Sequence, residues 1–143
     1  PAVAIDAQRQ GRAVALWAPF YDMPRTFAAT AKTGLRAMLE HQGWVPYRGL
    51  RISADFVAHL DAVDTAAVLA ENDSPLLVCH STMDQVVDIS ESHAYVARCA
   101  ELNRPCELVE SATADHDYTE YPDRQHLLTR TIHFFTDVFP STE

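Results

Sequence analysis

PLLVCHSTMDQVV, at residues 75–87, carries the strongest structural signal in the sequence. Residues 75–80 are almost all apolar, without the alternation of apolar and polar side chains that a half-exposed strand shows. Such a run is typical of a strand buried on both faces between helix layers. His80 ends the run, and we expect it to pack or to support a neighbour. The polar residues that follow, up to Asp84, indicate a loop that leaves the strand.

Similar elements lie on both sides of this stretch. Downstream, residues 90–102 have helical spacing, residues 105–110 form a second strand-like run, and residues 123–139 have the pattern of a closing amphipathic helix. Upstream, the apolar residues 12–18 are stopped by Pro19. Strands and helices that alternate with short links favour parallel strands joined by helical crossovers. The sequence therefore predicts an α/β fold with a parallel sheet flanked by helices.

Residues 22–64 differ in character from the rest of the chain. An aromatic-rich segment, residues 44–48, is interrupted by Pro46 and followed by Gly49, so we interpret it as irregular. Within this region, residues 25–41 and 54–60 have helical spacing. Outside it, residues 3–8 and 66–70 have helical spacing as well.

The composition limits the classes of partner. With 20 acidic residues against 11 basic ones, the 143-residue chain has a formal net charge of −9. A surface of that sign repels phosphate backbones and anionic lipids, so neither nucleic acid nor a membrane is an expected partner. No apolar run approaches the roughly 20 residues that span a bilayer. Cys79, Cys99 and Cys106 lack CxxC spacing, which is typical of reduced thiols in a cytoplasmic protein.

Two loops carry candidate catalytic side chains. Asp84 follows the strand at residues 75–80, and His116 follows the strand at residues 105–110. Ligands bind at the carboxyl ends of parallel strands, where these two loops should meet. An acid that orients a histidine base is part of nucleophilic catalysis. A metal site built from Asp84, His116 and Asp117 is the alternative, although no HxH or HExxH spacing supports it.

The same segments resemble those of a known family. Residues 75–87 resemble the segment that carries the catalytic acid in α/β-hydrolases, with Ser81 where that family usually has glycine. ADHDY, at residues 114–118, resembles the segment that carries their catalytic histidine. The order of acid and histidine along the chain also fits the family. RAVALWAP, at residues 12–19, resembles the family strand that follows the nucleophile helix.

This resemblance implies a domain organisation and an activity. Residues 1–21 and 65–143 would form the C-terminal half of the hydrolase core, and residues 22–64 would form a cap, as in cap-bearing serine esterases and lipases. The expected activity is cleavage of a carboxylic ester, with an amide or a thioester less favoured. Asp84 would orient His116 as the base, and no cofactor is required.

The nucleophile of such an enzyme is missing from the sequence. None of the four glycines belongs to a G-x-S-x-G motif. The opening residues 1–7 resemble the helix that begins directly after the nucleophile, so we expect the serine just before Pro1. The alternative is a non-catalytic fragment or an interaction module. An expected partner, besides an acyl ester, is the N-terminal half of the same protein or a second copy at an exposed sheet edge.

Further residues are candidates for substrate binding. Phe20 and Tyr21 follow a strand end, and Val86 lies in the loop of the acid. Trp44 and Tyr47 lie in the expected cap, where they could line an acyl pocket or only pack the cap's own core. The sequence leaves these two interpretations open.

Overall fold

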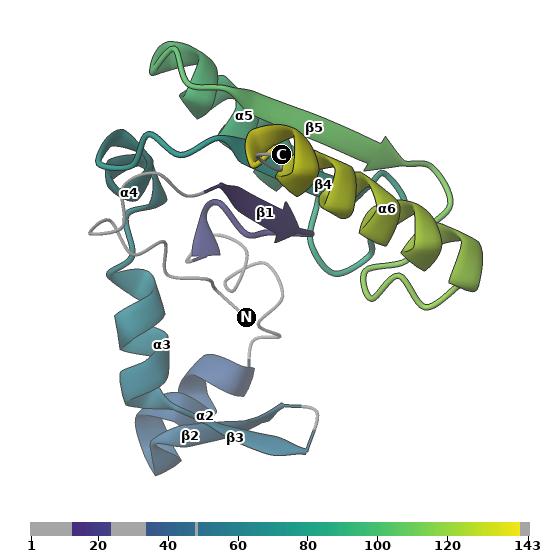
Figure 1. Ribbon diagram of the computed structural model, residues 1–143. Coiled ribbons are helices and arrows are strands. Elements are labelled where there is room, and N and C mark those ends of the chain that lie inside the picture. The colour runs from purple at the N-terminus through teal and green to yellow at the C-terminus, as the bar shows by residue number, and fades with distance from the viewer. Residues whose placement is uncertain (1–12, 24–33, 48, 141–143) are drawn as a thin grey trace. The chain divides into compact units, whose positions relative to one another are not determined.

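The computed structural model describes residues 13–23, 34–47 and 49–140 (Figure 1). The chain divides into two compact units: the larger one runs up to Tyr21 and resumes at Thr65, and the smaller one is Asp22–Asp64. The helix predicted at residues 3–8 and the first part of the one predicted at residues 25–41 lie outside the described residues.

The larger unit is built on a parallel sheet. Its strands are β1 (Val14–Trp17), β4 (Leu76–Ser81) and β5 (Cys106–Ser111), in the order β1-β4-β5. Both pairings are parallel, which confirms the predicted α/β class. Every residue of β4 is buried. Its central place in the sheet explains why the strand is apolar on both faces, as its sequence indicated.

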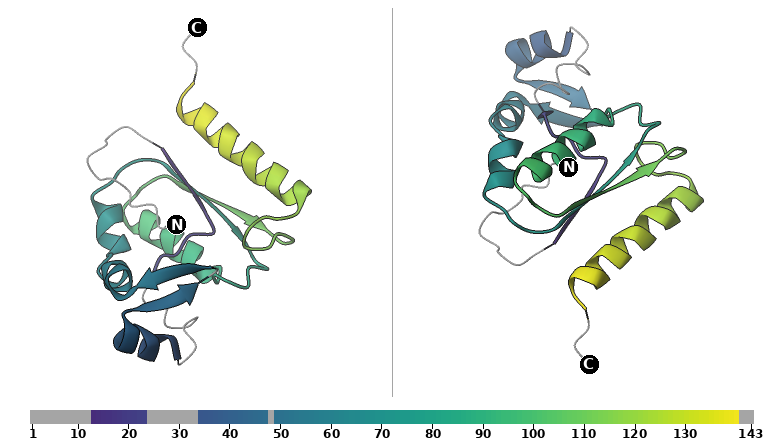
Figure 2. Two further views of the ribbon diagram at one scale, coloured as in Figure 1. Left: turned by 90° about the horizontal axis from the view of Figure 1, so that it is seen from below. Right: turned by 90° about the horizontal axis from the view of Figure 1, so that it is seen from above.

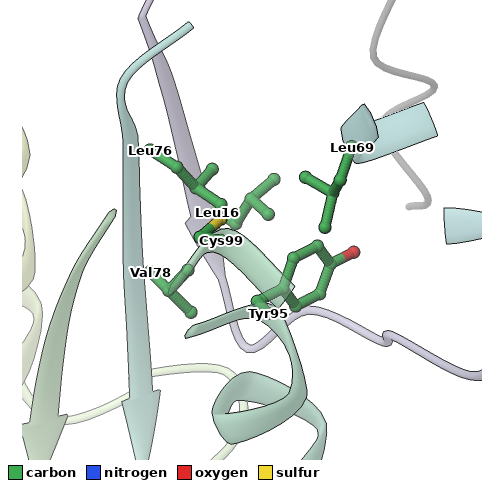
Figure 3. Packing of buried hydrophobic residues seen from close by; sticks show 6 residues of the cluster. All are labelled: Leu16, Leu69, Leu76, Val78, Tyr95 and Cys99. Carbon is green, nitrogen blue, oxygen red and sulfur yellow. The ribbon is translucent and has the colours of Figure 1, made fainter. Parts of the chain in front are cut away.

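One face of the sheet is covered by α4 (Thr65–Ala70) and α5 (Ser90–Glu101). Tyr95 and Cys99 lie one turn apart on α5, so they present one apolar stripe to the strands. They join one residue of β1, two alternate residues of β4 and one residue of α4 in a single buried cluster, whose members are Leu16, Leu69, Leu76, Val78, Tyr95 and Cys99 (Figure 3).

The opposite face is covered by α6 (Tyr121–Val138), and Figure 2 shows α5 and α6 on the two sides of the sheet. Pro122 stands in the first turn of α6, where its missing N–H costs no hydrogen bond. Leu77 and Cys79 of β4 pack here in a second cluster, whose members are Leu77, Cys79, Ala114, Tyr118 and Leu127. Within the described residues, no helix has the length and apolar character needed to cross a membrane.

The smaller unit contains a hairpin that the sequence analysis missed. Its elements are α2 (Gly34–Gln42), β2 (Trp44–Tyr47), β3 (Leu50–Ser53) and α3 (Ala54–Asp61). The interpretation of residues 44–48 as irregular was wrong for residues 44–47, because β2 pairs antiparallel with β3, and residue 48 lies outside the described residues. Gly49 adopts a φ of 81°, a turn conformation that glycine permits, and Pro46 is tolerated because a two-stranded sheet consists of edges.

The two faces of β4 predict which residues stabilise the larger unit. Leu77 has no exposed surface and belongs to the cluster beneath α6. We expect Leu77→Ala to lower the free energy of unfolding by about 2–5 kcal/mol, because it leaves a cavity in a close-packed core. Urea denaturation measures this loss. Ile132→Ala, at a residue of α6 that is 61% exposed, is the control and should change stability by no more than about 0.5 kcal/mol.

Candidate active site

The register of β4 and β5 brings two loops to the same edge of the sheet. His80 lies opposite Glu110 and Ser81 opposite Ser111, so both strands end at the same level. The pairing continues one step into the loops, where the backbone N–H of Thr82 donates to the carbonyl of Ser111 at 2.8 Å. The loops that carry the candidate acid and histidine therefore start side by side.

Asp84 and His116 meet at this edge, as the sequence analysis expected of them. Nδ1 of His116 lies 2.8 Å from Oδ2 of Asp84. The side chain of Asp84 is fully buried, whereas that of His116 is 24% exposed. The carboxylate can accept a hydrogen from Nδ1, which leaves the lone pair on Nε2 of His116 free to take a proton. This is the arrangement of an orienting acid and a general base.

The carboxylate of Asp84 is held by four donors. Oδ1 accepts hydrogen bonds from the backbone N–H of Val86 at 2.8 Å and of Val87 at 2.9 Å. Oδ2 faces Nδ1 of His116 and also Nε2 of His80, which lies 3.1 Å away. Burial by itself raises the pKa of Asp84, but the hydrogen bonds from Val87, His116 and Val86 outweigh burial and lower this pKa below its usual value.

His80 and Ser81 both contact this site; the sequence led us to expect His80 to pack or to support a neighbour and gave Ser81 no role. Successive residues of a strand point to opposite faces, so His80 faces α5 and Ser81 faces the histidine loop. Oγ of Ser81 donates to the carbonyl of Ala114 at 2.5 Å and accepts from the N–H of Met83 at 3.0 Å. Ser81 therefore links the acid loop to the histidine loop. The available signal was two polar residues at the end of a strand buried on both faces.

The loop after His116 is braced by its own polar groups. The carboxylate of Asp115 accepts hydrogen bonds from the backbone N–H of Thr119, at 2.9 Å, and from the hydroxyl of Thr119. These bonds lower the pKa of Asp115. Arg124 of α6 donates to the carbonyls of Tyr118, at 3.2 Å, and Thr119, at 2.6 Å. The bracing fixes the backbone on the C-terminal side of His116.

The expected substrate-binding residues of the larger unit lie in different environments. Val86 is half-buried, and its N–H is committed to Asp84. The ring of Tyr21 packs edge-on against Tyr95, with 5.1 Å between the ring centroids, and its N–H donates to Glu91 at 2.8 Å. The carbonyl of Phe20 accepts a hydrogen bond from the hydroxyl of Tyr95 at 2.7 Å. Phe20 and Tyr21 thus contact α5, and their role in a pocket stays a prediction.

The other two candidates belong to the smaller unit. Trp44 lies in β2. The guanidinium group of Arg51 stacks over its ring, 4.4 Å from the ring centroid. This contact favours packing within the unit, one of the two interpretations that the sequence left open. Tyr47 ends β2, and its side chain lies outside what the structure describes.

Cys79 and Cys106 are poor candidates for an alternative nucleophile. Burial raises the pKa of Cys79 to about 11 and that of Cys106 to about 12, so both remain protonated thiols at neutral pH. In the part of the chain that the structure describes, no cluster of three or more histidine, cysteine or acidic side chains is placed to hold a metal ion.

The fold is similar to those of solved hydrolases. Est1E from Butyrivibrio proteoclasticus, solved with bound ferulic acid, is 18% identical, with a TM-score of 0.55 over 69% of this chain and 38% of its own. The esterase domain of a Rhodothermus marinus protein is 22% identical, with a TM-score of 0.61 over 87% of this chain and 50% of its own. Mouse α/β-hydrolase domain-containing protein 10 is 18% identical, with a TM-score of 0.59 over 92% of this chain and 55% of its own.

The chain thus spans about half or less of the length of these solved structures, between 38% and 55%. None of the curated proteins matches the sequence significantly. The model of the prolyl oligopeptidase family matches residues 2–142, which is nearly the whole sequence. The chain therefore belongs to the prolyl oligopeptidase family, and with it to the α/β-hydrolase superfamily that its acid and histidine segments resemble.

Proposed function

We propose that this chain supplies the acid and the base of a serine hydrolase. The observation that carries the proposal is the 2.8 Å contact between Nδ1 of His116 and the buried carboxylate of Asp84, at the carboxyl edge of a parallel sheet. Membership of the prolyl oligopeptidase family supports the same class of reaction.

In the proposed reaction a serine hydroxyl attacks the acyl carbon of the substrate. Nε2 of His116 accepts the hydroxyl proton and then passes it to the leaving group, whose bond to the acyl carbon breaks. Water then attacks the acyl carbon of the acyl-enzyme, His116 transfers its proton to the serine oxygen, and the carboxylic acid product is released. Asp84 keeps His116 in the Nδ1–H tautomer and stabilises the imidazolium that forms transiently. This role requires Asp84 to be ionised, which agrees with its lowered pKa.

The serine of this proposal precedes Pro1. Two observations support this placement: the sequence has no G-x-S-x-G motif, and the chain spans only 38–55% of the solved hydrolases it resembles. The donors of the oxyanion hole are proposed to come from the same upstream region. In this proposal residues 22–64 form a cap, with Phe20, Tyr21, Trp44, Tyr47 and Val86 as substrate contacts.

The favoured substrate is a carboxylic ester. Two solved structures of similar fold carry the name esterase or Est1E, and both belong to proteins less than 25% identical to this chain. A peptide amide is the second candidate, because the matching family is that of prolyl oligopeptidase. The same acid and base serve both reactions, since each passes through an acyl-enzyme.

A further part of the proposal concerns the partner of this sheet. Within the described ranges, β4 pairs with one edge of β1 and no strand pairs with the other. An unpaired edge offers N–H and C=O groups to another strand. We assign this edge to a strand from the upstream part of the same protein. Cytoplasmic localisation belongs to the proposal as well.

Hydrolysis of model substrates tests the activity. The 143-residue chain should not cleave p-nitrophenyl acetate, whereas the protein extended upstream through its nucleophile should cleave it. His116→Ala should lower kcat of the longer protein by at least about a thousandfold, because the base is lost. His93→Ala, at an exposed histidine of α5, is the matched control and should retain activity.

The substrate class is read from a second pair of compounds, an unactivated methyl ester and a prolyl p-nitroanilide. Cleavage of the methyl ester with the higher kcat/KM supports the ester. Preference for the anilide would replace it by the peptide amide. If the longer protein cleaves nothing, the chain is a non-catalytic module and the hydrolase proposal fails.

The ionisation of Asp84 predicts a pH-dependent stability. Asp84→Asn should lower the free energy of unfolding by about 3 kcal/mol near neutral pH, because buried donors lose their charged acceptor. A lowered pKa in the folded state adds stability above the pKa of the unfolded chain and loses it as pH falls through the folded value. The gap between the two proteins should therefore close in acid below the usual value of 3.8. Urea denaturation across this range measures it.

Asp73→Asn, the same change at an exposed residue, is the control. Its free energy of unfolding should differ little from that of the unsubstituted protein at every pH. An equally small gap for Asp84→Asn near neutral pH would contradict the role of the carboxylate as a buried, ionised acceptor.

The open edge of β1 predicts association. The 143-residue chain alone should form dimers or larger species as its concentration rises, because the unpaired edge of β1 can pair with a second copy. Light scattering over a concentration series measures this. Co-production with the upstream part of the protein should give a one-to-one complex instead. A monodisperse monomer at high concentration would contradict the open edge.

A further inference from the structure

His80 occupies an unusual place for a histidine. It has no exposed surface, and it lies in β4, a strand of otherwise small or apolar buried residues. Its ring spans the gap between the acid loop and α5: Nε2 faces Asp84 and Val87, and Nδ1 faces Ser92. A buried polar ring costs free energy unless its nitrogens are hydrogen-bonded, and here both nitrogens are.

The partners of His80 define which nitrogen carries the hydrogen. Nε2 lies 3.1 Å from Oδ2 of Asp84 and 3.0 Å from the carbonyl oxygen of Val87, and an ionised carboxylate and a carbonyl only accept. Nε2 therefore carries the hydrogen. Nδ1 lies 2.6 Å from Oγ of Ser92, whose hydroxyl can donate to it. The ring is held in the Nε2–H tautomer from both sides.

The same carboxylate oxygen thus accepts hydrogen bonds from two imidazoles, one in the Nε2–H tautomer and the other in the Nδ1–H tautomer. Oδ2 of Asp84 receives Nε2–H of His80 from the side of α5 and Nδ1–H of His116 from the histidine loop. Oδ1 is already occupied by the two backbone donors of the acid loop. Among the four donors that the described residues supply to this carboxylate, His80 is the one that comes from the sheet itself, so it ties the position of Asp84 to β4.

We propose that His80 is a positioning residue, whose Nε2–H holds Oδ2 of Asp84 at the place where that oxygen orients His116. Ser92 supports this tautomer, because its hydroxyl donates to Nδ1 of His80. His80 does not exchange protons with the substrate. The effect of His80 on catalysis rests on the proposed function. The tautomers of His80 and His116 rest on their hydrogen-bond partners alone.

Nitrogen-15 spectra of labelled histidine test the tautomers in the protein that carries the nucleophile. Protonated and unprotonated ring nitrogens have well-separated shifts, so each tautomer is identified directly. At neutral pH, His80 should be protonated on Nε2 alone and His116 on Nδ1. A proton on Nδ1 alone of His80 would overturn the proposal, because Nε2 could not then donate to Asp84. This measurement needs neither activity nor a variant.

Two substitutions test the positioning. His80→Leu removes the donor and should lower kcat by about ten- to hundredfold with KM unchanged, as expected for one hydrogen bond to a charged group. It should also reduce the fraction of His116 in the Nδ1–H tautomer. His80→Gln places an amide N–H near the lost donor and should restore kcat to within about threefold of the original. A role in packing alone predicts no such rescue.

His93→Leu is the matched control, because it makes the same change on α5 at an exposed histidine paired with Glu110. It should leave kcat and the His116 spectrum unchanged. Equal losses in His80→Leu and His80→Gln, or no loss in either, would overturn the proposal. If the unsubstituted protein is inactive while both tautomers are as stated, the hydrolase function fails and the placement of His80 stands.

Discussion

The parallel pairing of β4 with β5 is the constraint on which the site depends. Because the two strands are in register to their last residues, the acid loop and the histidine loop leave the sheet at one level. The contact between Asp84 and His116, which lie 32 positions apart, then needs only two short loops. The side-chain hydroxyl of Ser81 and the backbone N–H of Thr82 add hydrogen bonds between the two loops.

A buried carboxylate is stable here because its surroundings replace the lost water. Two backbone N–H groups and two imidazoles surround Asp84, and the hydrogen bonds from Val87, His116 and Val86 outweigh the effect of burial on its pKa. The same donors leave the carboxylate little freedom to rotate. An ionised and immobile acid is what a histidine base requires to keep one tautomer. The same hydrogen bonds therefore allow Asp84 to be buried, keep it ionised and fix its orientation.

Strand alternation accounts for the polar residues at the end of β4. His80 and Ser81 are neighbours in sequence but point to opposite faces, so one supports the acid from α5 and the other links the two loops. The buried hydroxyl of Ser81 donates to the carbonyl of Ala114 and accepts from the N–H of Met83, so this polar side chain is fully hydrogen-bonded at the end of the strand.

The sequence by itself determined the α/β class and the meeting of Asp84 with His116, because hydrophobic periodicity and the order of the elements can be read from the sequence without knowing how the side chains pack. It failed for the hairpin of β2 and β3, where Pro46 and Gly49 read as breaks although an edge strand and a turn accept them. Only the tertiary structure decided the roles of His80 and Ser81. Their partners Ser92 and Ala114 are distant in sequence, and a side chain's hydrogen-bond partner is set by which face of the strand it occupies.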